Sequence, residues 1–114
     1  MTSYGKYLKD YTEEHTAHDP WSDLANAVVA QAADDYRRHC NKLVKFGATM
    51  SEVELRVLDG RINEIEVFFK SDWGYLLSHG LAPVIWERLQ AEFAEDIEAM
   101  YRRREERLKK EVST

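Results

Sequence analysis

Apolar side chains recur at intervals of three and four residues along most of this chain, and this spacing restricts the chain to helices. The clearest example reads Leu55, Leu58, Ile62, Ile65 and Phe69, which places all five side chains on one face of a helix. Most of the valines and isoleucines also follow this helical spacing, which does not favour a half-buried strand. The chain has 114 residues, of which 44% are hydrophobic, so it suits one domain with a single core. We therefore predict an all-α, single-domain helical bundle.

Capping residues mark where the predicted helices begin. Asp19-Pro20 opens the first helix, because Asp accepts a bond from an unpaired amide and Pro is tolerated in the first turn. Ser51 and Glu54 form a capping box before the second helix. Ser71 caps a short third helix, and Gly80 favours the left-handed conformation that ends it. The sequence thus predicts about four helices.

The fourth predicted helix begins at Pro83 and is long and charged. It runs for roughly 28 residues, or about 42 Å at 1.5 Å per residue. A compact domain of this size has a radius of gyration of only about 13 Å, so the last turns are expected to project from the body. The first half of this helix is mainly acidic, whereas the stretch from Arg102 to Lys110 is mainly basic.

The core is expected where the apolar faces of these helices meet. Its predicted members are Trp21, Val28, Tyr36, Leu58, Ile62, Ile65, Phe69, Trp73, Leu77, Trp86, Leu89, Phe93 and Ile97. Gly60 interrupts the second helix at a cost of about 1 kcal/mol relative to Ala. We attribute this glycine to close packing against a bulky neighbour.

Residues 1–18 precede the bundle domain of residues 19–114 and form a tyrosine-containing arm. Tyr4, Tyr7, Leu8 and Tyr11 have the spacing of one face of a short helix. Such a short helix is marginal in water and needs a surface to lie on. The arm is therefore docked on its own core, frayed, or used to recognise a partner.

Nothing in the sequence predicts catalysis, a cofactor or a metal site. It contains no Gly-rich phosphate loop, nucleophile elbow or His-Glu-x-x-His motif. His15, His18 and Asp19 are close together, but structural zinc takes four ligands and catalytic zinc three on a fixed framework. Cys40 is the only cysteine and is predicted to be a buried structural residue. We expect a protein that is not an enzyme.

Charge and hydropathy narrow the possible partners and location. The formal net charge of −5 disfavours tight binding of duplex DNA by this chain alone. No apolar run approaches the ~20 residues that span a membrane, and the first residues lack the apolar stretch of a signal peptide. We expect a cytoplasmic protein that has a protein partner, with a homodimer as a further option.

Two sets of side chains are candidates for contacting a protein partner. Grouped carboxylates can face a basic groove, including one that normally holds nucleic acid. The tyrosines of the arm are the second choice. The candidate residues are Glu92, Glu95, Asp96 and Glu98 in the acidic half of the fourth helix, and Tyr4, Tyr7 and Tyr11 in the arm.

Parts of the chain resemble a group of small uncharacterised helical proteins of phages and mobile elements in Gram-positive bacteria. Residues 64–73, Glu-Ile-Glu-Val-Phe-Phe-Lys-Ser-Asp-Trp, are similar to that group's Glu-Ile-Glu-x-Phe-Phe-x-Ser-Asp-Trp run. The alanine-rich residues 24–38 and the Ser-His-Gly at residues 78–80 extend the likeness over about half of the chain. The resemblance implies an accessory gene of a mobile element and carries no activity with it.

These observations together suggest a non-enzymatic, protein-binding accessory protein of a phage or mobile element. Small acidic proteins in that setting commonly block host defence nucleases, and the anti-CRISPR inhibitors of RNA-guided nucleases are among them. Two alternatives remain. One is a nucleic-acid-associated regulator or packaging accessory that uses the basic end of the fourth helix, and the other is a structural oligomerising module.

Overall fold

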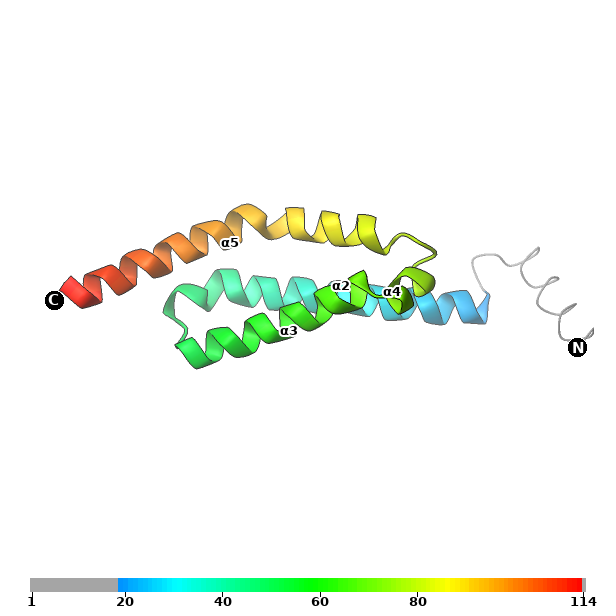
Figure 1. Cartoon of the computed structure of the whole chain (residues 1–114), viewed down its shortest axis with the longest axis horizontal. Coiled ribbons are helices and arrows are strands. Elements are labelled where there is room, and N and C mark those ends of the chain that lie inside the picture. The colour runs from blue at the N-terminus through cyan, green and yellow to red at the C-terminus, as the bar shows by residue number, and fades with distance from the viewer. Residues whose placement is uncertain (1–18, 114) are drawn as a thin grey trace, which may run out of the picture.

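The computed structural model describes residues 19–113, which fold into an all-helical bundle (Figure 1). Its elements are α2 (Pro20–Phe46), the short 3-10 helix η2 (Gly47–Thr49), α3 (Glu52–Lys70), α4 (Asp72–Leu77) and α5 (Ala82–Ser113). The prediction of four packed helices with a long charged helix at the C-terminal end is confirmed. No helix within these residues is both long and apolar enough to cross a membrane.

The predicted caps occur at the helix starts. Asp19 accepts a hydrogen bond from the amide of Ser22 at 3.2 Å. Ser51 and Glu54 form the reciprocal capping box. Ser71 ends α3 and caps α4 through the amide of Gly74. Because one serine serves two helices, the chain turns sharply there.

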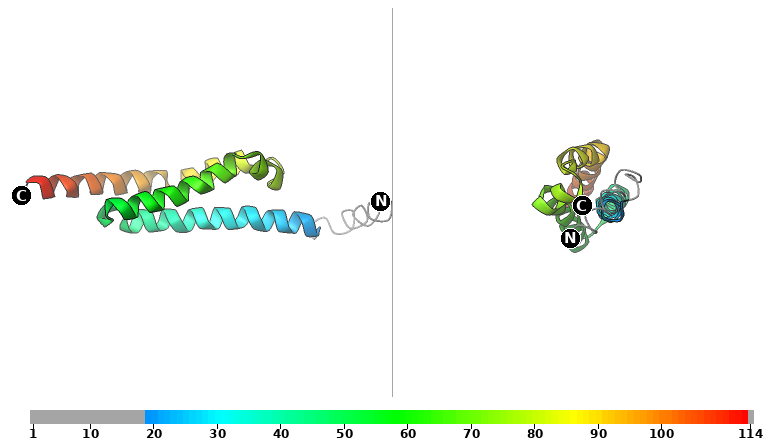
Figure 2. Two further views of the ribbon diagram at one scale, coloured as in Figure 1. Left: turned by 60° about the horizontal axis from the view of Figure 1, so that its bottom comes forward. Right: turned by 90° about the vertical axis from the view of Figure 1, so that its right-hand side faces the viewer.

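The three long helices lie side by side. α2 runs parallel to α5 and antiparallel to α3, and viewed end-on the three form a triangle (Figure 2). α4 closes the corner between α3 and α5. Two parts extend past the bundle at opposite ends: the first turns of α2 and the last turns of α5 (Figures 1 and 2).

Aromatic rings fill the larger part of the core. Trp86 of α5 stacks on Phe69 of α3 with ring centroids 5.7 Å apart. It also meets Tyr36 of α2 edge-on at 5.0 Å, and Tyr36 in turn contacts Phe93 at 6.0 Å. A smaller cluster lies near the α2–α3 turn and contains Leu43, Met50, Leu55, Leu58 and Met100. The predicted core residues that are buried are Tyr36, Leu58, Phe69, Leu77, Trp86, Leu89 and Phe93, while Ile62, Ile65 and Ile97 are half-buried against them.

Three predicted core residues are exposed, and those predictions are wrong. Trp21 is 64% exposed because the first turns of α2 extend beyond the other helices. Val28 is 39% exposed, since it lies beside the α2 face that buries Ala25 and Val29. Trp73 is 54% exposed, because α4 is a short helix and the residues that it directs inward are Gly74 and Leu77.

The explanation predicted for Gly60 is also wrong. A Cβ atom built on this glycine would meet nothing within 4 Å, so no bulky neighbour in residues 19–113 requires it. Two other glycines are tightly enclosed. A Cβ on Gly47 would lie 2.7 Å from the Met100 sulfur, and one on Gly74 would overlap the carbonyl oxygen of Phe68.

Candidate protein-interaction surface

The acidic half of α5 presents its carboxylates outward, away from the core. Leu89 and Phe93 are buried, and with the half-buried Ile97 they form the face of α5 that packs on α2 and α3. Glu95 lies about 180° around the helix from this face, at 100° per residue. Asp96 and Glu98 lie on its two flanks, and all three acidic side chains are exposed.

The four predicted acidic residues differ in how they are paired. Glu98 lies 3.8 Å from Arg102 one turn later. Glu95 and Asp96 form no ion pair within residues 19–113. The surface available to a partner therefore centres on these two carboxylates.

Glu92 is engaged within the molecule. The Nε and Nη2 atoms of Arg37 each donate a 3.0 Å hydrogen bond to one oxygen of the Glu92 carboxylate. This bidentate pair joins α2 to α5 and holds the pKa of Glu92 below its usual range. Because the pair occupies both carboxylate oxygens, Glu92 is the least suitable of the four residues for recognising a partner.

The basic half of α5 is used largely for structure. Arg104 is only 6% exposed, and its Nη1 donates to the carbonyl oxygens of Gly47 at 2.9 Å and Met50 at 2.6 Å. Its Nη2 reaches the Glu52 carboxylate at 3.2 Å. Arg107 donates to the carbonyl of Ala48 at 3.0 Å. These arginines satisfy carbonyls in the turn that follows α2, so we call this group the arginine clamp.

The clamp residues are not among the predicted site residues, although the sequence carries a signal for them. The buried positions of α5 continue by threes and fours from Phe93 through Ile97 and Met100, and the next member of that series is Arg104. An arginine in a core register needs buried acceptors, and the carbonyls at the end of a helix supply them. The clamp also leaves fewer basic side chains for the nucleic-acid alternative, because Arg104 and Arg107 bind the turn.

Burial shifts the pKa values of three titratable side chains in or beside the core. Burial raises the pKa of the Cys40 thiol and that of the Tyr36 hydroxyl, so both stay protonated at neutral pH. Burial, reinforced by Arg38 and Arg61, lowers the pKa of His39. Cys40 is fully buried, and a buried neutral thiol is a poor nucleophile.

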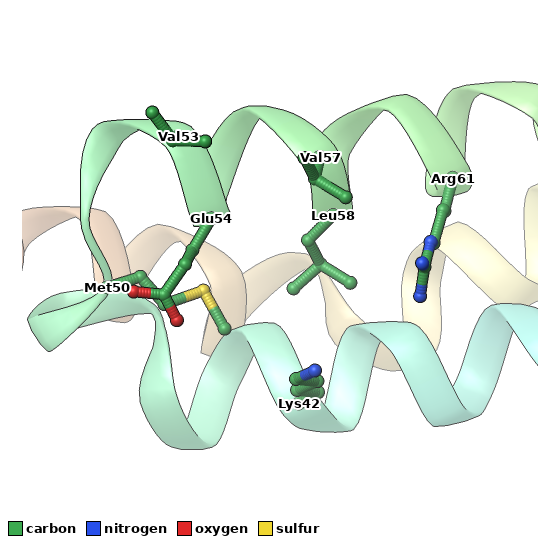
Figure 3. A pocket seen from close by; sticks show the side chains of 7 residues that line it. All are labelled: Lys42, Met50, Val53, Glu54, Val57, Leu58 and Arg61. Atoms are coloured by element: carbon green, nitrogen blue, oxygen red, sulfur yellow. The ribbon is translucent and has the colours of Figure 1, made fainter.

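A shallow hollow lies between the end of α2 and the start of α3 (Figure 3). Leu58 points across it toward α2, whereas Val53 lies on the far side of the α3 ribbon. The hollow brings together aliphatic side chains and isolated charges, with no nucleophile beside a base. Its lining consists of Lys42, Met50, Val53, Glu54, Val57, Leu58 and Arg61.

The remaining predicted site residues lie outside the region that the structure describes. These are the arm tyrosines Tyr4, Tyr7 and Tyr11, together with His15 and His18. Within residues 19–113, no group of three or more His, Cys, Asp or Glu side chains is placed to hold a metal ion. Comparisons with protein-family models, with curated proteins and with solved structures found no match.

Proposed function

We propose that this chain is a non-enzymatic, protein-binding accessory protein of a phage or mobile element that inhibits a host defence nuclease of the RNA-guided kind. The observation that carries the proposal is the outward face of α5, where Glu95 and Asp96 have no ion-pair partner within the described residues. A helix anchored before and after these residues presents their charges in a fixed spacing. Spaced carboxylates can occupy a groove that normally binds phosphates.

The anchoring of α5 supports this role. Trp86, Leu89 and Phe93 hold the helix on one side of the acidic face, and the arginine clamp holds it on the other. The backbone that carries these carboxylates therefore loses little conformational freedom when a partner binds. Such preorganisation lowers the entropic cost of association.

The test is inhibition of purified RNA-guided nucleases loaded with guide RNA. We expect the chain to slow target cleavage by at least one nuclease of a panel at near-stoichiometric ratio, and to bind that nuclease in surface plasmon resonance. Binding should weaken as salt rises, because the contact is electrostatic. Failure to bind or inhibit any member of a broad panel would contradict the proposal.

A matched pair of variants locates the contact. The test variant combines Glu95→Gln, Asp96→Asn and Glu98→Gln. The control variant removes three charges elsewhere, through Asp23→Asn, Asp72→Asn and Glu106→Gln. We expect only the test variant to associate roughly tenfold more slowly, since rim charges act mainly on the association rate. Equal rates for the two variants would move the contact to another surface, with the tyrosine arm as the next candidate.

A further inference from the structure

Gly60 has no explanation within residues 19–113. It lies near the middle of α3, at an exposed position, and a Cβ atom there would meet nothing within 4 Å. Glycine is unfavourable in a helix interior because it loses the most backbone entropy on folding. A glycine that is tolerated on an open helix face suggests that a second backbone approaches it closely.

The surroundings of Gly60 form a second apolar stripe on α3. At the helical period, Val53, Val57, Gly60 and Val67 share one face, and Glu64 is the charged residue at the position between Gly60 and Val67. This outer face is opposite the one that buries Leu55, Leu58 and Phe69. Val53, Val57 and Val67 are 67%, 52% and 61% exposed, so α3 presents an apolar stripe to solvent as well as to the core.

The stripe is symmetric about Gly60 at two of its three pairs of positions, the exception being Val57, whose counterpart three residues after Gly60 is Asn63. Val53 lies seven residues before the glycine and Val67 seven residues after it. Arg56 lies four residues before it and Glu64 four residues after it. If two copies of α3 crossed antiparallel at Gly60, each Val53 would face the partner's Val67, and each Arg56 would face the partner's Glu64.

We propose that the chain forms an antiparallel, two-fold symmetric dimer through the outer face of α3, with the two Gly60 residues at the crossing point. Helices in contact lie about 8–10 Å apart, and glycine at the crossing permits the short end of that range. The valines exclude water on both sides of the crossing. Because the interface is isologous, each contact occurs twice.

Charge complementarity favours a second copy as the occupant of this face. Arg56 and Glu64 are both exposed and form no ion pair within residues 19–113. Their equal distances from Gly60 allow each to pair reciprocally across a two-fold axis. An unrelated protein partner would not require this symmetry. The inference is independent of the acidic face of α5, because α3 and α5 occupy different corners of the three-helix bundle (Figure 2).

The first test replaces Gly60 by leucine in the full chain. Leucine fits the open space of the monomer and favours helix, so Gly60→Leu should raise the melting temperature of dilute protein. In the dimer the same side chain separates the two helices. We expect analytical ultracentrifugation to show a dimer of the unchanged chain at micromolar concentrations, and a dissociation constant at least tenfold higher for Gly60→Leu.

The second test compares two valines. Val57→Glu places two buried charges in the proposed interface, whereas Val84→Glu changes an equally half-exposed valine at the start of α5. We expect only Val57→Glu to abolish the dimer. If both variants or neither abolish it, the outer face of α3 is not the interface.

A charge exchange tests the geometry independently of folding. Arg56→Glu and Glu64→Arg should each weaken the dimer, because each places like charges opposite one another. The double variant should restore it. A Gly60→Cys variant in a Cys40→Ser background should also form an intermolecular disulfide on oxidation, whereas Glu95→Cys in that background should not. A chain that stays monomeric at several hundred micromolar would overturn the proposal and assign this face to another occupant, such as the tyrosine arm or a foreign protein.

Discussion

The two ends of the bundle are closed in different ways. At the α2–α3 end, the arginine clamp of α5 binds the backbone carbonyls of the turn, and Met100 fills the space beneath Gly47. At the opposite end, α4 covers the bundle, and the backbone of its Gly74 packs directly against the backbone carbonyl of Phe68. Trp73, Tyr75 and Leu76 of α4 remain exposed. Long side chains can adjust and backbone cannot, so the two ends should respond differently to mutation.

The largest expected difference in stability is between alanine variants of two tryptophans, the buried Trp86 and the exposed Trp73. Trp86 is buried against Phe69 and Tyr36, and truncating such a ring costs about 3–5 kcal/mol. Trp73 is half-exposed, so Trp73→Ala should cost less than half as much as Trp86→Ala. Chemical denaturation of both variants measures this. Equal losses would mean that α4 buries Trp73 in solution.

Removing the clamp should be nearly as costly. Arg104→Ala leaves the Met50 carbonyl without its arginine donor and the Gly47 carbonyl with only a 3.4 Å bond from the Met50 amide, and an unsatisfied buried acceptor costs about 1–3 kcal/mol. We expect a loss of roughly 3 kcal/mol in the free energy of unfolding. The control is Arg102→Ala, whose exposed side chain lies 3.8 Å from Glu98 and should change stability by less than about 0.5 kcal/mol.

Alanine substitutions at Gly74 and at Gly47 compare the two ends of the bundle directly. Gly74→Ala forces a Cβ against the backbone carbonyl of Phe68, which has no room to move, and overpacking of this kind costs about 1–3 kcal/mol. Gly47→Ala meets only the flexible side chain of Met100, so its cost should fall at the low end of that range. Gly60→Ala should stabilise the monomer by about 1 kcal/mol. Thermal melts would contradict this comparison if Gly47→Ala were the most damaging.

The smallest effect on stability is expected for the Arg37–Glu92 ion pair, which lies between the two ends of the bundle. Both side chains are about half-exposed, so the pair should contribute about 0.2–1 kcal/mol. Because folding lowers the pKa of Glu92 below 4.5, this contribution is present at neutral pH and is lost as the pH falls through the lowered value. An NMR titration should show the lowered pKa, and Arg37→Gln should return it to the ordinary range. An unchanged Glu92 pKa in the Arg37→Gln variant would show that the ion pair does not form in solution.

Local signals in the sequence predicted much of the fold. Asp19, Ser51 and Ser71 act through hydrogen bonds to amides a few residues away, so their roles depend on neighbours along the chain. The exposure of Trp21 and Trp73 could not be predicted in this way. It depends on how far each helix extends relative to its neighbours, which is determined by tertiary packing.

The candidate sites were less predictable than the helices. Glu92 and Glu95 look alike in the sequence, yet only Glu92 has an arginine within reach on a neighbouring helix. The difference arises from the register of α2 against α5. Gly60 was recognised as unusual, but its place on an open face required the three-dimensional arrangement.

The clamp also has a consequence for the order of folding. Arg104 contacts residues that precede it by 52 to 57 positions, so these bonds form only after most of the chain has folded back on itself. Interactions made after the rate-limiting step leave the folding rate unchanged and slow unfolding. We therefore expect Arg104→Ala to act almost entirely on the unfolding arm of a chevron plot. The clamp would then determine how long each folded molecule persists.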